Sequence, residues 1–69
     1  MSTFGTNLKI IRKNRNISQQ EFAMRMKTTQ QRVSEWECDK IEPSLYNIMK
    51  ILKVLEIDFE ELIDGITIE

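Results

Sequence analysis

The side chains best suited to bind a ligand by hydrogen bonds lie together at residues 29–35. Amide, guanidinium, hydroxyl and carboxylate groups follow one another there, around a single apolar residue, Val33. Such groups suit the edges of bases, because glutamine can bond adenine N6 and N7 together and glutamate can accept from cytosine N4. The chemistry that this segment indicates is recognition by hydrogen bonding.

The rest of the chain offers little to build catalysis or a metal site. It contains no histidine and one cysteine, Cys38, and it has no glycine-rich phosphate loop. Glu60 and Glu61 are adjacent, so on a helix they would point in different directions and not act as a pair. We therefore expect no enzyme, no metal, no cofactor and no disulfide framework.

Two helix-start signals lie close together and define the element that must position the polar segment. Ser18 and Glu21 have the S-x-x-E spacing of a capping box, and Thr29 is placed as the N-cap of a following helix that runs to about Glu37. Residues 18–37 are therefore predicted to form a helix-turn-helix. In such a motif the second helix lies in the major groove of DNA and contacts bases with its N-terminal end.

Three residues are expected to hold these two helices together. Ala23 is small enough for a close crossing, while Val33 and Trp36 are three residues apart and so share one face of the second helix. That spacing predicts a core position for Trp36, although stacking of its ring on a base is the alternative.

Helical patterns continue on both sides of this motif. A first helix is predicted at about residues 5–14, a fourth after Ser44, and a short fifth from an Asp58–Glu61 capping box to about residue 64, with Gly65 at its end. The inward stripe of the fourth helix is predicted to be Leu45, Ile48, Leu52 and Leu55, flanked by Met49 and Ile51. The expected fold class is all-α, a compact bundle of about five helices in one domain, residues 1–69.

Charge is distributed unevenly along the chain, although the formal net charge is only −1. Residues 1–37 carry seven basic and three acidic side chains, a net of +4, whereas residues 38–69 carry three basic and eight acidic ones, a net of −5. A domain polarised in this way can offer a positive face to phosphates. A random scatter of surface charges is the alternative.

The segment ISQQEFAMRMKTTQQRVSEWE, followed by PSLYNIMKILKVLEIDFEELI, resembles the Xre/Cro-type helix-turn-helix family of phage repressors and bacterial regulators. The resemblance covers roughly residues 6–63 and includes Leu8, Lys9 and Arg12 of the first helix, Ala23, and the Pro43–Ser44 pair. It implies a lambda-repressor-like fold, binding to double-stranded DNA and regulation of transcription.

The resemblance also implies roles for individual residues. Base reading falls to Gln30, Gln31, Glu35 and Arg32, and contacts with the DNA backbone fall to Gln19, Thr29, Ser34, Lys27 and Lys40. Gln19 would also buttress Gln30, and Arg32 could reach either a phosphate or a guanine. Lys27 departs from the pattern, because the family favours glycine in this turn and a left-handed lysine costs about 1–2 kcal/mol. Glu42 lies in a loop that often carries positive charge, which predicts fewer phosphate contacts.

Arg12 and Glu37 match positions that form a buried ion pair in this family; two unrelated surface charges are the alternative. Apolar residues near the C-terminus exceed what so small a core needs, and a dimer surface is expected from Ile57, Phe59, Ile63, Ile66 and Ile68. Two-fold symmetry would then place the recognition helices about 34 Å apart on a palindromic site. A monomer with a folded-back tail is the alternative.

The sequence thus predicts a homodimeric repressor of bacterial or phage origin, acting in the cytoplasm at the nucleoid. No secretory h-region and no run of about 18 apolar residues is present, so neither export nor a membrane span is expected. The alternative function is an antitoxin or another interaction module whose acidic half holds a small basic partner, such as a toxin. RNA polymerase is a further candidate partner.

Overall fold

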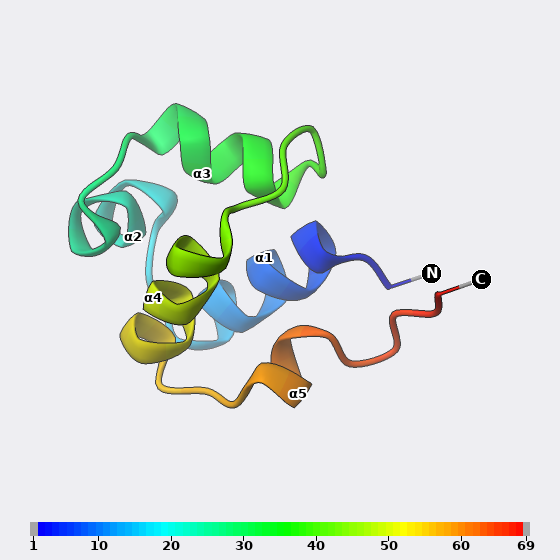
Figure 1. Cartoon of the computed structure of the whole chain (residues 1–69). Coiled ribbons are helices and arrows are strands. Elements are labelled where there is room, and N and C mark those ends of the chain that lie inside the picture. The colour runs from blue at the N-terminus through cyan, green and yellow to red at the C-terminus, as the bar shows by residue number, and fades with distance from the viewer. Residues whose placement is uncertain (1, 69) are drawn as a thin grey trace.

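The computed structural model describes residues 2–68, which fold into helices without any strand. The helices are α1 (Phe4–Asn14), α2 (Gln19–Met26), α3 (Gln30–Glu37), α4 (Leu45–Leu55) and α5 (Phe59–Leu62). Helix α1 packs against both α3 and α5, which lie on opposite sides of it (Figure 1). The all-helical fold class predicted from the sequence is confirmed. No helix among residues 2–68 has the length and apolar character needed to cross a membrane.

Hydroxyl caps start three of the helices where the sequence predicts them. Ser18 Oγ accepts from the Glu21 N–H at 3.0 Å, Thr29 Oγ1 from the Arg32 N–H at 3.1 Å, and Ser44 Oγ from the Asn47 N–H at 3.2 Å. The predicted Ser18–Glu21 capping box is only half formed, because the Glu21 carboxylate pairs with Arg25 at 2.5 Å. An i, i+4 ion pair along α2 thus replaces the reciprocal bond.

The two terminal helices differ from their predicted bounds for local reasons. Helix α1 begins earlier because Thr3 and Thr6 form a capping box, with the Thr3 N–H donating to Thr6 Oγ1 at 2.9 Å. Helix α5 ends at Leu62, two residues before the predicted end, although its Asp58–Glu61 capping box is present. The Asn7 amide donates to the carbonyls of Leu62 and Asp64, each at 2.9 Å, and so holds the chain in the turn that follows.

A single cluster of apolar side chains forms the core between the helices. Trp36 is 1% exposed and packs in this cluster, which confirms its core position and excludes base stacking. Each of the five helices contributes at least one member. The buried apolar residues are Leu8, Ile17, Phe22, Ala23, Met26, Val33, Trp36, Ile51, Leu55, Ile57 and Leu62.

The predicted inward stripe of α4 is wrong at its start. Leu45 is 73% exposed, whereas Ile51 is fully buried and Leu55 is 1% exposed. With 3.6 residues per turn, Leu45 lies about 120° around the helix from Ile51, so both cannot face the same core. Helix α4 is therefore rotated relative to the prediction, and Leu45, Tyr46 and Met49 in its N-terminal half are exposed.

Candidate DNA-binding surface

Helix α3 buries one face and presents the other to solvent. Val33 and Trp36 point into the core, while Gln30, Gln31 and Arg32 are exposed at the N-terminal end of the helix. Because the first turn of a helix also carries free backbone N–H groups, this end suits a polyanion with hydrogen-bonding edges.

The turn between α2 and α3 has the left-handed geometry expected of a helix-turn-helix. Lys27 adopts φ 58° and ψ 46°, and its N–H donates to the carbonyls of Ala23 and Met24. The Thr28 N–H also donates to the Ala23 carbonyl, at 2.9 Å. Ala23 itself is 3% exposed, so a small residue lies where the two helices meet.

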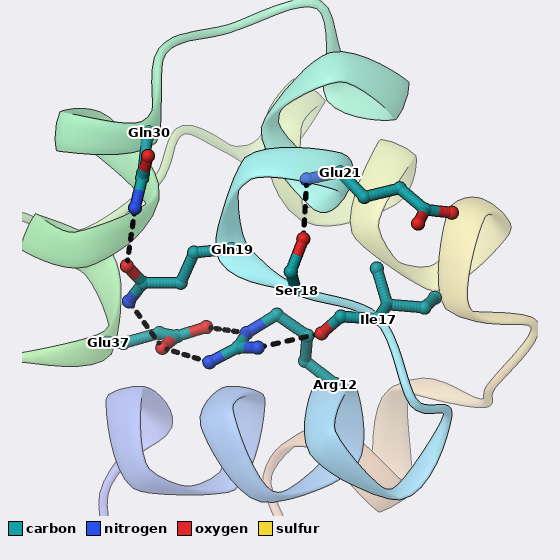
Figure 2. A network of polar contacts seen from close by, with 7 residues as sticks. All are labelled: Arg12, Ile17, Ser18, Gln19, Glu21, Gln30 and Glu37. Carbon is teal, nitrogen blue, oxygen red and sulfur yellow. Dashed lines mark hydrogen bonds and ion pairs between the residues drawn. The ribbon is translucent and has the colours of Figure 1, made fainter.

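Arg12 and Glu37 come together as a buried ion pair that joins α1 to α3 (Figure 2). Arg12 Nε lies 2.6 Å from Glu37 Oε2, and Arg12 Nη2 donates to Glu37 Oε1 at 3.0 Å. Arg12 Nη1 also donates to the Ile17 carbonyl at 2.7 Å. Each residue is 5% exposed, so this bidentate geometry compensates two buried charges and fixes the C-terminal end of α3.

Gln19 extends this network to the exposed end of α3. Its Nε2 donates to Glu37 Oε1 at 2.9 Å, and its Oε1 accepts from Gln30 Nε2 at 3.5 Å. Figure 2 shows the resulting chain of contacts, which runs from Arg12 through Glu37 and Gln19 to Gln30. One hydrogen of the Gln19 amide is not used by these bonds and is available to a phosphate oxygen.

The other residues assigned to DNA differ in how far they reach into solvent. Lys27, Thr29 and Lys40 are exposed, and the Thr29 hydroxyl oxygen also caps α3. Ser34 and Glu35 are half-buried, and Glu35 follows Gln31 by one helical turn. Of these two lysines, Lys27 lies in the turn between α2 and α3, and Lys40 lies in the loop after α3.

One contact that the sequence reasoning missed fixes α1 against the end of α3. Asp39 Oδ1 accepts from the Gly5 N–H at 2.9 Å, and Asp39 Oδ2 accepts from the Thr3 hydroxyl at 2.6 Å. A Cβ atom on Gly5 would lie 2.5 Å from the Glu37 carbonyl, so only glycine permits this approach. A glycine inside a helical segment was the signal available in the sequence.

The residues assigned to a dimer surface do not all lie at the surface. Ile57 is 8% exposed and belongs to the core, so it has little area to give to a second chain. Phe59 is 47%, Ile63 38% and Ile68 91% exposed, and Ile66 is half-buried.

The helix-turn-helix family HTH_3 matches the chain over residues 8–62. The chain therefore belongs to this family of Xre/Cro-like helix-turn-helix proteins, as its sequence predicted. Its fold is the lambda-repressor-like fold of that family. Membership supports a role in DNA binding and transcription regulation. A search of curated proteins finds no match to the chain.

Proposed function

We propose that this protein binds duplex DNA sequence-specifically through α3 and represses transcription as a homodimer at a palindromic operator. The observation that carries the proposal is the placement of Gln30 at the exposed start of α3, where its amide is linked through Gln19 to the buried Arg12–Glu37 pair. A base-reading side chain held before binding loses less conformational entropy when it meets its base.

In this proposal the exposed face of α3 reads the major groove. Gln30 and Gln31 bond to base edges, adenine being the base that an amide matches in a bidentate way. Glu35, one turn further along, accepts from a cytosine N4 amino group. Arg32 contacts either a guanine or a phosphate, since its guanidinium suits both.

Phosphate contacts come from residues around the motif and are few. Gln19, Lys27, Thr29, Ser34 and Lys40 supply them, and only two of these side chains carry a positive charge. Glu42 is exposed in the loop that contains Lys40 and adds a negative charge there. Each neutralised phosphate adds about 0.9 to the steepness with which the logarithm of the affinity falls against the logarithm of the salt concentration. Since few phosphates are neutralised, we expect a modest salt dependence for a DNA-binding protein.

The proposed dimer rests on apolar side chains that are exposed near the C-terminus. The exposed apolar side chains of Phe59, Ile63 and Ile68, with the half-buried Ile66, are the surface that we assign to the second copy. A two-fold axis through this contact would present two copies of α3 to successive major grooves about 34 Å apart. Occupation of a promoter is then enough to repress it, in the cytoplasm of a bacterium or in a phage-infected cell.

Selection of bound duplexes from a random library tests the proposal. The expected result is an inverted repeat whose half-sites are about 10–10.5 base pairs apart, centre to centre. No enriched sequence would overturn sequence-specific binding. A single half-site would leave DNA reading intact and overturn the dimer.

A second candidate function is an interaction module, such as an antitoxin, that holds a small basic partner. The supporting observation is a groove between α1 and α5 lined by Ile11, Glu60, Glu61 and Asp64. Because α5 lies on the side of α1 away from α3, such a partner would not compete with DNA (Figure 1). A small basic protein co-purifying with the native chain would support this function, and its absence would contradict it.

A further inference from the structure

Lys50 on α4 reaches across to the last residue of α2. Its Nζ donates to the Met26 carbonyl at 2.5 Å, and the side chain is half-buried. The same ammonium lies 5.7 Å from the centre of the Tyr46 ring, one turn earlier on α4. Lys50 is thus held on two sides within the molecule, unlike Lys53, which is exposed on the same helix.

The carbonyl that Lys50 binds belongs to Met26, in the last turn of α2. Carbonyls in the last turn of a helix lack partners within the helix and form the negative end of its dipole, so an ammonium there is favourable. The Ala23 and Met24 carbonyls receive N–H groups from the turn, whereas the Met26 carbonyl receives Lys50. The next residue is Lys27, whose left-handed backbone carries strain that glycine would avoid.

One path from α4 to the reading helix passes through this bond. Helix α3 packs against α1 and α2, and α4 packs against α2. Only residues 27–29 separate the Met26 carbonyl from Gln30, the first residue of α3. A shift at the end of α2 would move the N-terminal end of α3, where base reading is proposed.

We propose that Lys50 is a positioning residue for DNA reading: it ties the turn of the helix-turn-helix to α4, and its charge is used inside the protein and not on a phosphate. The inference rests on the proposed function, since it concerns the same site. It separates Lys50 from Lys27 and Lys40, which are assigned to phosphates.

The tie itself can be tested without DNA. In Lys50→Met the aliphatic stem remains and only the ammonium is lost, and Lys53→Met is the matched control. Hydrogen exchange should become faster at the Thr28 amide, which bonds to the Ala23 carbonyl at the turn, and stay unchanged at the Leu55 amide within α4. Exchange that rises equally at both amides, or at neither, would overturn the tie. If Lys50→Met does not fold, Lys50→Leu, which also lacks a donor, takes its place in the same comparison, with Lys53→Leu as its control.

DNA binding then separates positioning from phosphate contact. Affinities for a selected duplex and a scrambled duplex are measured over a range of KCl concentrations, at a temperature where each variant is folded. Lys50→Met should lose about tenfold in preference for the selected duplex, the effect of losing one hydrogen bond to a charged group, with the salt slope unchanged. Lys40→Met should lower the slope by about one with little change in preference.

Two results would overturn the role of Lys50. A slope lowered by about one in Lys50→Met would make it a phosphate contact, and an unchanged preference would make it a purely structural residue. Failure of the proposed function is distinguishable, because the parent chain would then show no preference for any duplex while the exchange comparison could still succeed.

Discussion

At the scale of single residues, Gln30, which is proposed to read DNA, is supported by a chain of side chains that ends in a buried ion pair. Gln30 is bonded to Gln19, and Gln19 to Glu37, whose charge is balanced by Arg12. Gln30 is exposed to solvent, Gln19 is half-buried, and Arg12 and Glu37 are buried. Substitutions at the exposed end of this series of contacts should therefore affect DNA recognition, and substitutions at its buried end should affect the stability of the fold.

Replacing an exposed amide should change recognition and not folding. Gln31→Ala is expected to lose about 1–3 kcal/mol of discrimination at one base pair of each half-site, because a bidentate contact is removed. The melting temperature should stay at the parent value, since Gln31 is exposed. Binding to a set of single-base variants of the selected duplex measures the effect, with Gln20→Ala on α2 as control. Discrimination equal to the parent at every position would remove Gln31 from the reading face.

Replacing one member of the buried pair should destabilise the fold. Arg12→Ala is expected to lower the free energy of unfolding by about 3–5 kcal/mol, because Glu37 is left as an unpaired buried charge. The double variant Arg12→Met with Glu37→Met should recover much of this loss, since no charge then remains buried. Urea unfolding measures both, with the exposed Lys13→Ala as control. A double variant less stable than Arg12→Ala would contradict this account.

At the scale of elements, local signals predicted the helices and long-range packing set their details. The Ser18, Thr29 and Ser44 caps are predictable because each involves residues only three apart. The rotation of α4 was not predictable, because Leu45 and Ile51 are both apolar and only contacts with other helices decide which is buried. The Asp39 contact with the start of α1 was missed for the same reason, since 34 residues separate Asp39 from Gly5.

The candidate site residues also divide into those predictable from local sequence and those placed only by long-range packing. Exposure of Gln31 follows from the burial of Val33 and Trp36, because Gln31 lies roughly 140–160° around the helix from both. Gln30 is exposed at the first position of the helix, although it is only three residues from Val33. The position of Ile57 does not follow from its neighbours: it lies in the turn after α4, and only the fold places it in the core. Helical periodicity gives no information in such turns.

The end of α4 offers a test of backbone strain. Glu56 adopts φ 56° and ψ 50°, so Glu56→Gly should raise the free energy of unfolding by about 1 kcal/mol by removing left-handed strain. Lys53→Gly, inside the same helix, should lower it by about 1 kcal/mol. Urea unfolding of the two variants gives the comparison. If both variants had a lower free energy of unfolding than the parent, the backbone conformation at position 56 would not be a source of strain.

At the scale of the whole molecule, the fold separates surfaces of different chemistry. Helix α3 carries the amides on one side of α1, and α5 carries Glu60 and Glu61 on the other (Figure 1). An acidic surface repels phosphates, so the charge distribution favours one orientation on DNA. Apolar side chains remain exposed both on α5 and its tail and on the first turn of α4.

Those two apolar surfaces allow the proposed dimer to be tested. Phe59→Glu should weaken self-association by about tenfold or more, because a charge would be buried in the contact. Leu45→Glu, at a position that is 73% exposed, should leave it unchanged. Sedimentation equilibrium of both variants and the parent measures the effect. If Leu45→Glu dissociated the dimer and Phe59→Glu did not, the dimer surface would have to be assigned to α4 instead of α5 and its tail.

The central claim is that α3 reads DNA sequence, and one affinity ratio tests it most directly. The parent chain is titrated, at about 0.15 M salt, with its selected duplex and with a scrambled duplex of the same length and composition. The account predicts that the selected duplex binds at least about 10³-fold more tightly, the lower range for sequence-specific proteins. Equal affinity for the two duplexes would contradict it.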